Sequence, residues 1–405
     1  MMGYERKKMR QSSLVYKVLR RLTWYIGRVL PIDNNKILLS SYYGRGYSDN
    51  LKYIADELLK DKKYRLIWVV NGEKDVSTLP EGITPCLKDS INFVYQVSTS
   101  AIWIDNCRKS FLYKKKKQFY IQTYHGGAAG KKCERDAENK LGKEYVEMSI
   151  KDGAATDLMI SSDGFMTNLY HTSFWYNGPV AETGYPRYDI LFKDDHSEEI
   201  EKIRHFFNLE KGTSYILYAP TFRRDLSFDV YDIDYKRVIE AFEKRFNKKY
   251  VVLVHLHPNV ATKFSQLEYN EQVINATVYP DMQELMAASD VLIGDYSSVN
   301  LEFALMRKPV FRFAVDVEEY RNDRDMYYGM DEYPYSLAEN NNQLIKNISE
   351  FDEQQYLEKL EKFFIRVGAV FNPHASKDCA DLIRDYYECG LDKKKFFEMH
   401  RDDFK

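Results

Sequence analysis

Short apolar, β-branched runs alternate with helical stretches along most of this 405-residue chain, and this alternation constrains the fold more than any other feature. Helical patterns at Asn50–Lys60 and Ile91–Thr99 separate some of the runs in the first half. The strands predicted there are Lys36–Ser41, Tyr64–Val70, Ala101–Asp105, Gln118–Tyr124 and Asp157–Ser161. Strands that alternate with helices form a parallel sheet with helices on both faces. The sequence therefore predicts an α/β fold.

A Gly- and Pro-rich stretch at 178–189, GPVAETGYPRYD, interrupts the alternation, which then resumes. The later strands are expected at Ser214–Ala219, Tyr250–His255, Val291–Gly294 and Pro309–Phe313, with helical patterns near 234–247, 281–289 and 299–306. Because 405 residues exceed the usual size of one hydrophobic core, we predict two α/β domains, at 31–190 and 191–405. The C-terminal helices, near 351–366 and 376–388, can pack back on the first domain.

Composition places the chain among ordinary soluble proteins, with 44% hydrophobic and 30% charged residues. The formal net charge of -2 gives no bias toward nucleic acid, and no nucleic-acid partner is expected. The five cysteines form no C-x-x-C pair, and their odd number favours reduced thiols in the cytoplasm. No signal peptide is present, and no stretch approaches the roughly 20 apolar residues of a membrane span. We therefore expect a cytoplasmic protein.

Residues 1–30 carry most of the charge asymmetry, because they hold eight Lys or Arg residues and only one Glu. Apolar residues lie between the basic ones, so a helix here would be basic and amphipathic. Such a segment lies on an anionic membrane surface. The alternative is a first helix that packs on its own domain and leaves a basic face in solvent. We predict a peripheral position on the inner face of the cell membrane.

The ends of the predicted strands carry the unusual chemistry, and ligands of open α/β sheets bind beyond the carboxyl ends of the strands. In YHGGAAGKK, residues 124–132, a strand ends in His125, and Gly126, Gly127 and Lys131 follow. Glycines let backbone N–H groups approach an anion, and lysine adds charge. The spacing is not that of a P-loop. A plain tight turn with a surface histidine is the alternative.

A second strand end, YAPTFRRD at 218–225, places Pro220, Thr221 and Arg223 together. Thr221 is suited to cap a helix or to bind an anion. The third is HLHP, in which His255 and His257 point the same way because they are two residues apart on a strand. Two histidines can bind a metal, but no third ligand has a convincing spacing. A phosphate-facing His257 is favoured.

The fourth strand end is GDYSSVNLEFA, where Ser297 and Ser298 precede a predicted helix. Unpaired N–H groups at a helix start favour an anion, and the two hydroxyls add donors. Glu302, one turn later, is suited to accept hydrogen bonds from sugar hydroxyls. The alternative is a serine that only caps the helix. Arg187 in GYPRYD follows the fifth strand end, where an ordinary surface turn is the alternative. Together these groups predict a diphosphate-bearing substrate in a cleft between the domains.

The order of these motifs resembles the CDP-glycerol glycerophosphotransferase family, whose members build teichoic acids and related capsular polymers. The motifs are YHGG, GYPRYD, YAPTFRRD, HLHP, GDYSSVNLEFA and KPVFRFAVDVEEYRNDRDMYY, and the likeness runs from about Ser40 to FNPHASKDCADLI at 371–383. The resemblance implies a GT-B fold, with two Rossmann-like, doubly wound domains around a cleft. It also implies that a hydroxyl of a membrane-linked polymer precursor attacks the glycerol-bearing phosphorus of CDP-glycerol, and that CMP leaves.

The resemblance also implies a role for each motif residue. His125 is expected to act as the general base, and His257 to steady the diphosphate or the leaving phosphate. Ser297 and Ser298 match a phosphate-binding serine pair. Pro220 and Thr221 match a nucleotide-contacting pair, and Arg187 matches a phosphate-binding arginine. No metal or other cofactor is expected, because lysines, arginines and helix ends supply the positive charge.

Several positions depart from the family pattern. Tyr124 replaces a frequent Trp, His255 stands where many members have Arg, and Glu302 stands where an Asp is common. CDP-ribitol is therefore the main rival donor. A GT-B nucleotide-sugar glycosyltransferase, or a non-catalytic protein that binds polymer or membrane, is a more distant alternative. Because the chain has no long N-terminal extension, addition of a single unit is as well supported as polymerisation.

Overall fold

The computed structural model describes residues 14–109, 113–127, 130–221, 233–256, 269–317, 319 and 325–405. Two compact units make up the chain. The first contains the described residues up to His125 together with Glu134–Asp189 and His374–Lys405. The second contains Gly126–Cys133 and Ile190–Pro373. The expected cleft between two domains depends on how they are placed relative to each other, and it stays a prediction.

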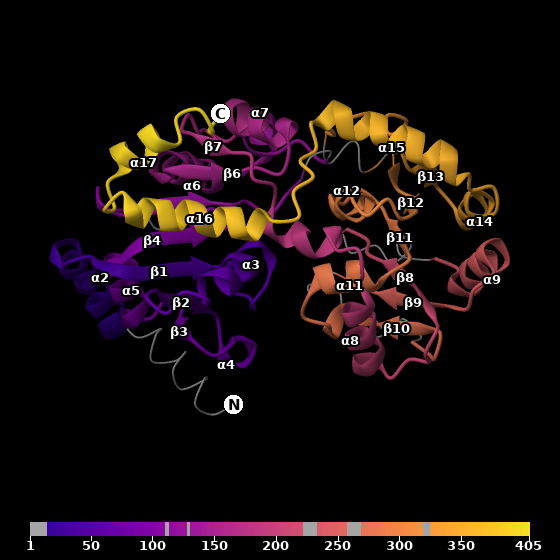
Figure 1. The fold of residues 1–405 in the computed structure, drawn as a ribbon, viewed down its shortest axis with the longest axis horizontal. Helices are drawn as coiled ribbons and strands as arrows, with labels where there is room; N and C mark the ends of the chain where they lie inside the picture. The colour runs from indigo at the N-terminus through magenta and orange to yellow at the C-terminus, as the bar shows by residue number, and fades with distance from the viewer. Residues whose placement is uncertain are drawn as a thin grey trace. The chain divides into compact units, whose positions relative to one another are not determined.

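The first unit is built on a seven-stranded parallel sheet with the order β3-β2-β1-β4-β5-β6-β7 (Figure 1). Its strands are β1 (Asp33–Ser40), β2 (Arg65–Val70), β3 (Ile83–Leu87), β4 (Ser100–Asp105), β5 (Phe119–Gln122), β6 (Leu158–Ile160) and β7 (Val180–Ala181). All six residues of β4 and all four of β5 are buried, as expected for central parallel strands covered on both faces.

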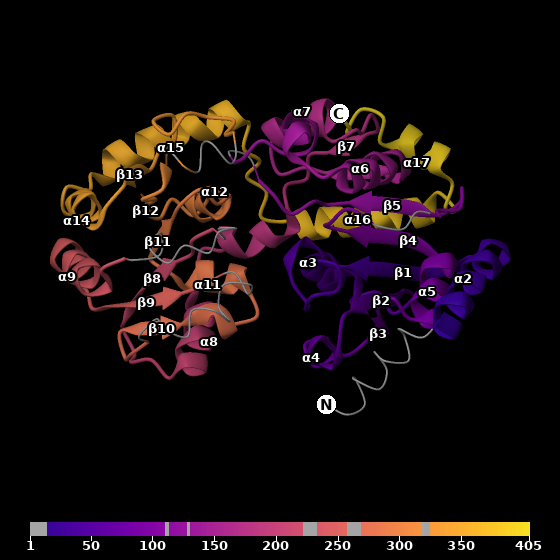
Figure 2. The same ribbon diagram turned by 180° about the vertical axis from the view of Figure 1, so that it is seen from behind.

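Neighbouring residues of β5 show how the two faces of this sheet are covered. Tyr120 points into a core with Trp103 of β4 and Phe93 of α5 (Ile91–Thr99). Phe119 points the other way and stacks on Tyr386 of α16 (Ala375–Glu388), with ring centroids 4.4 Å apart. This alternation follows from the two-residue period of a strand. The C-terminal helices therefore cover one face of the first sheet, as Figure 2 shows from behind.

Helices complete the first unit. Besides α5 and α16 they are α2 (Leu14–Val29), α3 (Asp49–Leu58), α4 (Glu73–Val76), η1 (Glu134–Lys140), α6 (Lys143–Ala155), α7 (Gly164–Ser173) and α17 (Lys393–Met399), and η2 (Pro186–Phe192) spans the boundary of the units. The start of α16 is held by Asp189, whose carboxylate accepts the backbone N–H groups of Ala375 and Ser376, each at 2.9 Å. This contact fixes the C-terminal helices to the GYPRYD turn.

The second unit is a six-stranded parallel sheet with the order β10-β9-β8-β11-β12-β13. Its strands are β8 (Ser214–Tyr218), β9 (Tyr250–Val254), β10 (Val273–Asn275), β11 (Val291–Gly294), β12 (Val310–Phe313) and β13 (Ser336–Ala338). Its helices are α8 (Ser197–Phe207), α9 (Tyr235–Phe246), η4 (Ala276–Val278), α11 (Met282–Ala288), α12 (Val299–Ala304), α14 (Asn341–Ser349) and α15 (Glu353–Val367).

The main core of the second unit lies between its sheet and two helices that pack on each other, α9 and α14. Phe242 of α9 and Leu344 of α14 are fully buried against Phe311 and Phe313 of β12. Between those two strand residues, Arg312 points to the opposite face of the sheet. The predicted α/β class with two parallel-sheet domains is confirmed.

Candidate functional site

His125 follows β5 in the first unit, is half-buried, and has its ring held by a neighbouring strand end. Its Nδ1 atom lies 2.6 Å from the carbonyl oxygen of Asn106, just after β4. Because a carbonyl only accepts hydrogen bonds, Nδ1 of the neutral ring carries the hydrogen and donates it. Cys107 Sγ lies 3.7 Å from the same nitrogen. The ring therefore presents Nε2 as the atom that can take up a proton.

Strained backbone surrounds this imidazole. The rings of Tyr42 and Tyr124 flank it, with centroids 5.4 Å and 4.7 Å from the His125 ring. Tyr42, Tyr43, Asp49 and Tyr124 have φ angles of 42°, 61°, 62° and 54°, in the left-handed region that residues other than glycine rarely adopt. Such residues gather at functional sites, where the surrounding structure imposes the conformation. Their concentration here supports the assignment of His125.

Arg187 contributes to this cluster through a buried ion pair and hydrogen bonds to the backbone. It is only 1% exposed, and its Nη1 lies 3.3 Å from the carboxylate of Asp49. Its Nη2 donates to the His125 carbonyl at 3.3 Å. The Arg187 N–H donates to Asn50, whose amide in turn donates to the Tyr124 carbonyl. Arg187 is thus buried against a carboxylate and holds the His125 loop, and its predicted contact with phosphate stays a prediction.

The glycine-rich segment after His125 belongs to the second unit. Gly126 and Gly127 are half-buried, and Lys131 forms an isolated antiparallel bridge with Met326. The next residue, Lys132, donates its backbone N–H to the Asp325 carbonyl at 2.7 Å. These bonds explain why the segment groups with the second unit. The anion-binding role of the two glycines and of Lys131 stays a prediction.

In the second unit, Asp295 ties together the ends of two adjacent strands, β8 and β11. Its carboxylate accepts the backbone N–H of Thr221 at 2.8 Å and the Thr221 hydroxyl at 2.5 Å. The backbone N–H of Tyr296 donates to the same carboxylate at 2.6 Å. Pro220 is buried, and Thr221 is half-buried. Thr221 is therefore placed beside the start of α12 by a residue that we did not predict to belong to the site.

The two serines before α12 have different surroundings. The Ser297 hydroxyl accepts the backbone N–H of Val299 at 3.3 Å, whereas the Ser298 side chain makes no capping hydrogen bond. Both serines are half-buried. Glu302 is only 4% exposed. The predicted contact of Glu302 with sugar hydroxyls stays a prediction.

His255 lies just after β9, half-buried, and its backbone N–H donates to the Tyr218 carbonyl of β8 at 2.9 Å. His257 and Arg223 lie outside the described residues. Among the residues that the structure does describe, no three His, Cys, Asp or Glu side chains form a group suited to a metal ion. The predicted roles of both histidines therefore stay predictions.

Sheet order explains which residues are brought together. Strands β9, β8 and β11 are neighbours, so their carboxyl ends place His255, Thr221 and Ser297 along one edge of the second sheet. Strands β1, β4 and β5 are neighbours in the first sheet, and their ends carry Tyr42, Asn106 and His125. The edge of the second sheet offers hydroxyl and imidazole groups to an anion, and the edge of the first sheet offers a proton acceptor. This division suits transfer of a phosphoryl group to a hydroxyl.

Comparison with known proteins identifies the family of this chain. A family model described as CDP-Glycerol:Poly(glycerophosphate) glycerophosphotransferase matches residues 23–384. A teichoic acid poly(glycerol phosphate) polymerase of Staphylococcus epidermidis is 30% identical over 87% of this chain and 51% of its own length. A teichoic acid glycerol-phosphate transferase of Staphylococcus aureus is 29% identical over 87% of this chain and 93% of its own length. Teichoic acid ribitol-phosphate enzymes also match, at 24% to 28% identity.

Among solved structures, the wall teichoic acid polymerase TagF has a TM-score of 0.82 and 27% identity, covering 97% of this chain and 99% of that chain. This likeness confirms the predicted GT-B type of fold. The chain spans about half the length of the first two curated relatives, at 51% of each.

Proposed function

Because the chain belongs to the CDP-glycerol:poly(glycerophosphate) glycerophosphotransferase family, we propose that it transfers glycerol phosphate from CDP-glycerol to a hydroxyl of a membrane-linked teichoic acid or capsule precursor. CMP is the second product. The observation that supports this most strongly is the half-buried His125, whose Nδ1 is engaged by the Asn106 carbonyl and whose Nε2 is left as proton acceptor.

The proposed reaction balances with one proton transfer. The acceptor hydroxyl gives its proton to Nε2 of His125 as its oxygen attacks the glycerol-bearing phosphorus of CDP-glycerol. A new oxygen–phosphorus bond forms, and the bond from that phosphorus to the CMP oxygen breaks. Asn106 keeps the ring in the correct tautomer, and its carbonyl stabilises the imidazolium that forms.

The donor groups are assigned to the second unit. Ser298 offers a hydroxyl that makes no capping hydrogen bond, and Ser297 offers a second hydroxyl beside it. Such donors neutralise the charge of a diphosphate, which is the main task in phosphoryl transfer. Among the residues outside the described part, His257 and Arg223 are proposed to add to this set by the family resemblance.

A CMP-release assay tests the proposal. Purified protein is given CDP-glycerol or CDP-ribitol with a lipid-linked acceptor. His125→Ala is compared with the control His205→Ala, because the His205 side chain on α8 is 72% exposed. We expect release from CDP-glycerol in the wild type and in His205→Ala, and loss in His125→Ala. Release from UDP-sugars alone would refute the reaction class.

The ribitol-phosphate relatives favour a second candidate, transfer of ribitol phosphate from CDP-ribitol. The same catalytic step applies, because the two donors differ only in the alditol. Faster release from CDP-ribitol than from CDP-glycerol, again lost in His125→Ala, would select this candidate.

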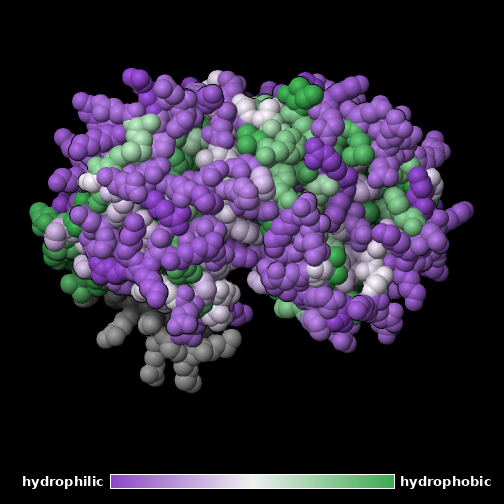
Figure 3. All heavy atoms as spheres, viewed as in Figure 1, coloured by the Kyte–Doolittle hydropathy of each residue, from purple (hydrophilic) through white to green (hydrophobic). Residues whose placement is uncertain are grey.

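We also propose that α2 holds the protein on an anionic membrane surface. Green spheres mark a hydrophobic surface over α2 at the edge of Figure 3. The large hydrophobic and aromatic side chains exposed there are Val18, Leu19, Leu22, Tyr25, Ile26 and Val29. Basic residues lie close by, since Arg28 lies over the ring of Tyr113 at 4.5 Å and Lys115 bonds to the Leu30 carbonyl. No helix within the described residues combines the length and the apolar character needed to cross a bilayer.

Substitution tests this better than deletion of residues 1–30, because Trp24 on the same helix packs against the core of the first unit. Leu22→Ser with Ile26→Ser changes only exposed side chains, at 52% and 56% exposure. We expect weaker binding to phosphatidylserine vesicles and unchanged turnover of a soluble acceptor. Equal vesicle binding by variant and wild type would refute the membrane role.

A further inference from the structure

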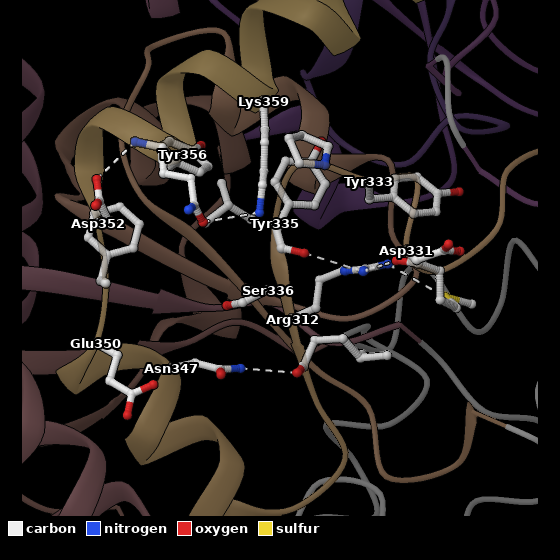
Figure 4. Close-up of a pocket in the computed structure, with 16 residues that line it drawn as sticks. Arg312, Asp331, Tyr333, Tyr335, Ser336, Asn347, Glu350, Asp352, Tyr356 and Lys359 are labelled. Atoms are coloured by element: carbon white, nitrogen blue, oxygen red, sulfur yellow. Dashed lines mark hydrogen bonds between the residues drawn. The ribbon is translucent and has the colours of Figure 1, made fainter.

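A pocket of about 630 Å³ lies in the second unit between α15 and strands β12 and β13 (Figure 4). Its volume is in the range of small-molecule sites. Polar groups and aromatic rings line it together, and the residues that matter most are Arg312, Tyr333, Tyr335, Tyr356 and Lys359. None of them has a role in the proposed donor or acceptor chemistry.

Arg312 is the unusual feature of this pocket. It is 3% exposed, yet the structure shows no carboxylate within ion-pair distance of it among the described residues. Its Nη2 donates to the carbonyls of Met330 at 2.5 Å and Tyr335 at 3.4 Å, and its Nη1 lies 3.5 Å from Met330 Sδ. Burial lowers the pKa of Arg312. A buried cation with only neutral partners is costly, and a bound anion would relieve this cost.

Two buried polar atoms in the lining have no hydrogen-bond partner within the described part of the chain, and both belong to donor groups. They are Nε of Arg312 and the hydroxyl oxygen of Tyr335. Unsatisfied buried donors are rare in native proteins and call for an explanation, such as a ligand. A second cation, Lys359, lies at the exposed side of the pocket on α15, where its Nζ donates to Gln355 Oε1 at 3.2 Å. Figure 4 shows Arg312 on the strand side and Lys359 on the helix side of the pocket.

The carboxylates around the pocket lie at its exposed rim. Asp352 caps α15 by accepting the backbone N–H of Gln355 at 2.9 Å, and Glu350 lies 4.0 Å from Lys346 on the protein surface. Asp331 is exposed as well. The inner part of the pocket is therefore cationic and aromatic, which suits an anionic group joined to a carbon chain.

A smaller space shares three lining residues with the pocket and is also lined by Ser297 of the proposed donor site. This space of about 10 Å³, the size of a single water, is lined by Arg312, Tyr333, Tyr335 and Ser297. Arg312 thus stands between the pocket and the start of α12.

We propose that this pocket binds a phosphorylated polyol, with Arg312 and Lys359 contacting the phosphate and the tyrosine rings packing on the polyol carbons. The proposed function supplies the class of ligand, a glycerol phosphate unit, either free or within a poly(glycerol phosphate) chain. Phosphate contacts with Arg are charge-assisted and strong, and aromatic faces bind the C–H groups of polyols.

Binding is tested on the full chain with glycerol 3-phosphate, a short poly(glycerol phosphate), inorganic phosphate and glycerol. The variants are Arg312→Met, Lys359→Met and the control Lys362→Met, which removes an exposed lysine of α15 outside the pocket. We expect the glycerol phosphates to bind the wild type and Lys362→Met equally, and both pocket variants at least about tenfold more weakly. Stronger binding of poly(glycerol phosphate) than of glycerol 3-phosphate identifies the polymer as the ligand of the pocket, and the reverse identifies the free compound.

Thermal unfolding separates binding from folding. Each variant is first unfolded without ligand, because Arg312→Met removes the donor to the Met330 and Tyr335 carbonyls. Glycerol phosphate should then raise the midpoint of the wild type and of Lys362→Met alike, and that of the two pocket variants less. If Arg312→Met fails to fold, Lys359→Met decides. Equal affinity of wild type and both pocket variants, or inorganic phosphate binding as tightly as glycerol 3-phosphate, would overturn the proposal. Absence of CMP release would refute the proposed function and leave this binding result intact.

Discussion

Replacing Arg187 with Met distinguishes a residue that positions His125 from one that binds phosphate. The substitution leaves the Asp49 carboxylate, 3% exposed, without the guanidinium that now lies 3.3 Å away. Breaking a buried ion pair from one side costs about 3–5 kcal/mol of unfolding free energy. It also removes the hydrogen bond to the His125 carbonyl, and a small displacement of a catalytic group can lower kcat about 100-fold.

Tryptophan fluorescence during urea unfolding measures this loss, because Trp24, Trp68, Trp103 and Trp175 all belong to the first unit. The control Lys377→Ala removes an exposed ion pair with Asp381 in the same unit, and its midpoint should stay nearly unchanged.

The double variant Asp49→Asn with Arg187→Met tests the cause of the instability. It should recover most of the stability, because no uncompensated charge remains, while kcat stays low. Wild-type-like stability and kcat in Arg187→Met, with a raised KM for CDP-glycerol, would instead show that Arg187 binds phosphate.

Three further predictions follow from single contacts. Burial lowers the pKa of Lys114, which is paired with Asp157, to about 8. Between about pH 8 and 10.5 the unfolded chain therefore binds more protons than the folded chain at this site. The free energy of unfolding contributed by Lys114 rises with pH over that range. Lys114→Met should lack this rise, which amounts to at most about 3 kcal/mol. Urea unfolding followed by tryptophan fluorescence measures it, and parallel pH profiles of unfolding free energy for wild type and variant would contradict the prediction. Ser298→Ala should raise the KM for CDP-glycerol without loss of stability. Ser297→Ala should also lose the hydrogen bond from the Val299 N–H, worth about 1 kcal/mol of unfolding free energy. Identical effects of the two substitutions on stability would contradict this. CMP release should survive EDTA, and complete loss restored by a divalent ion would show a metal requirement.

The central strands were predictable because they are continuous apolar runs buried on both faces. The predicted run Ala101–Asp105, for example, is β4 within one residue. The short edge strands were not predicted, since β7 has only two residues and β3 contains Pro85, which a strand tolerates at an edge. Edge strands contribute little pattern of their own, and their pairing depends on the sheet already formed.

The same distinction holds for the site. His125 and Ser297 were predictable because strand ends of parallel sheets are where ligands bind. The burial of Arg187 was not, because its partner Asp49 is 138 residues away in sequence. Arg312 gave no signal either, since a single cation within an apolar strand has no periodic pattern. Asn106 and Asp295 directly follow predicted strands, and this position was the signal by which they could have been found.

The most direct test of the proposed reaction is a balance of its two products. CDP-glycerol labelled in the glycerol is incubated with the lipid-linked acceptor, and labelled lipid and CMP are counted for the wild type and for His125→Ala. We predict one labelled glycerol phosphate in the lipid fraction for each CMP released, and loss of both products in His125→Ala. CMP without labelled lipid, or undiminished transfer by His125→Ala, would contradict the role of His125 as the base in glycerol phosphate transfer.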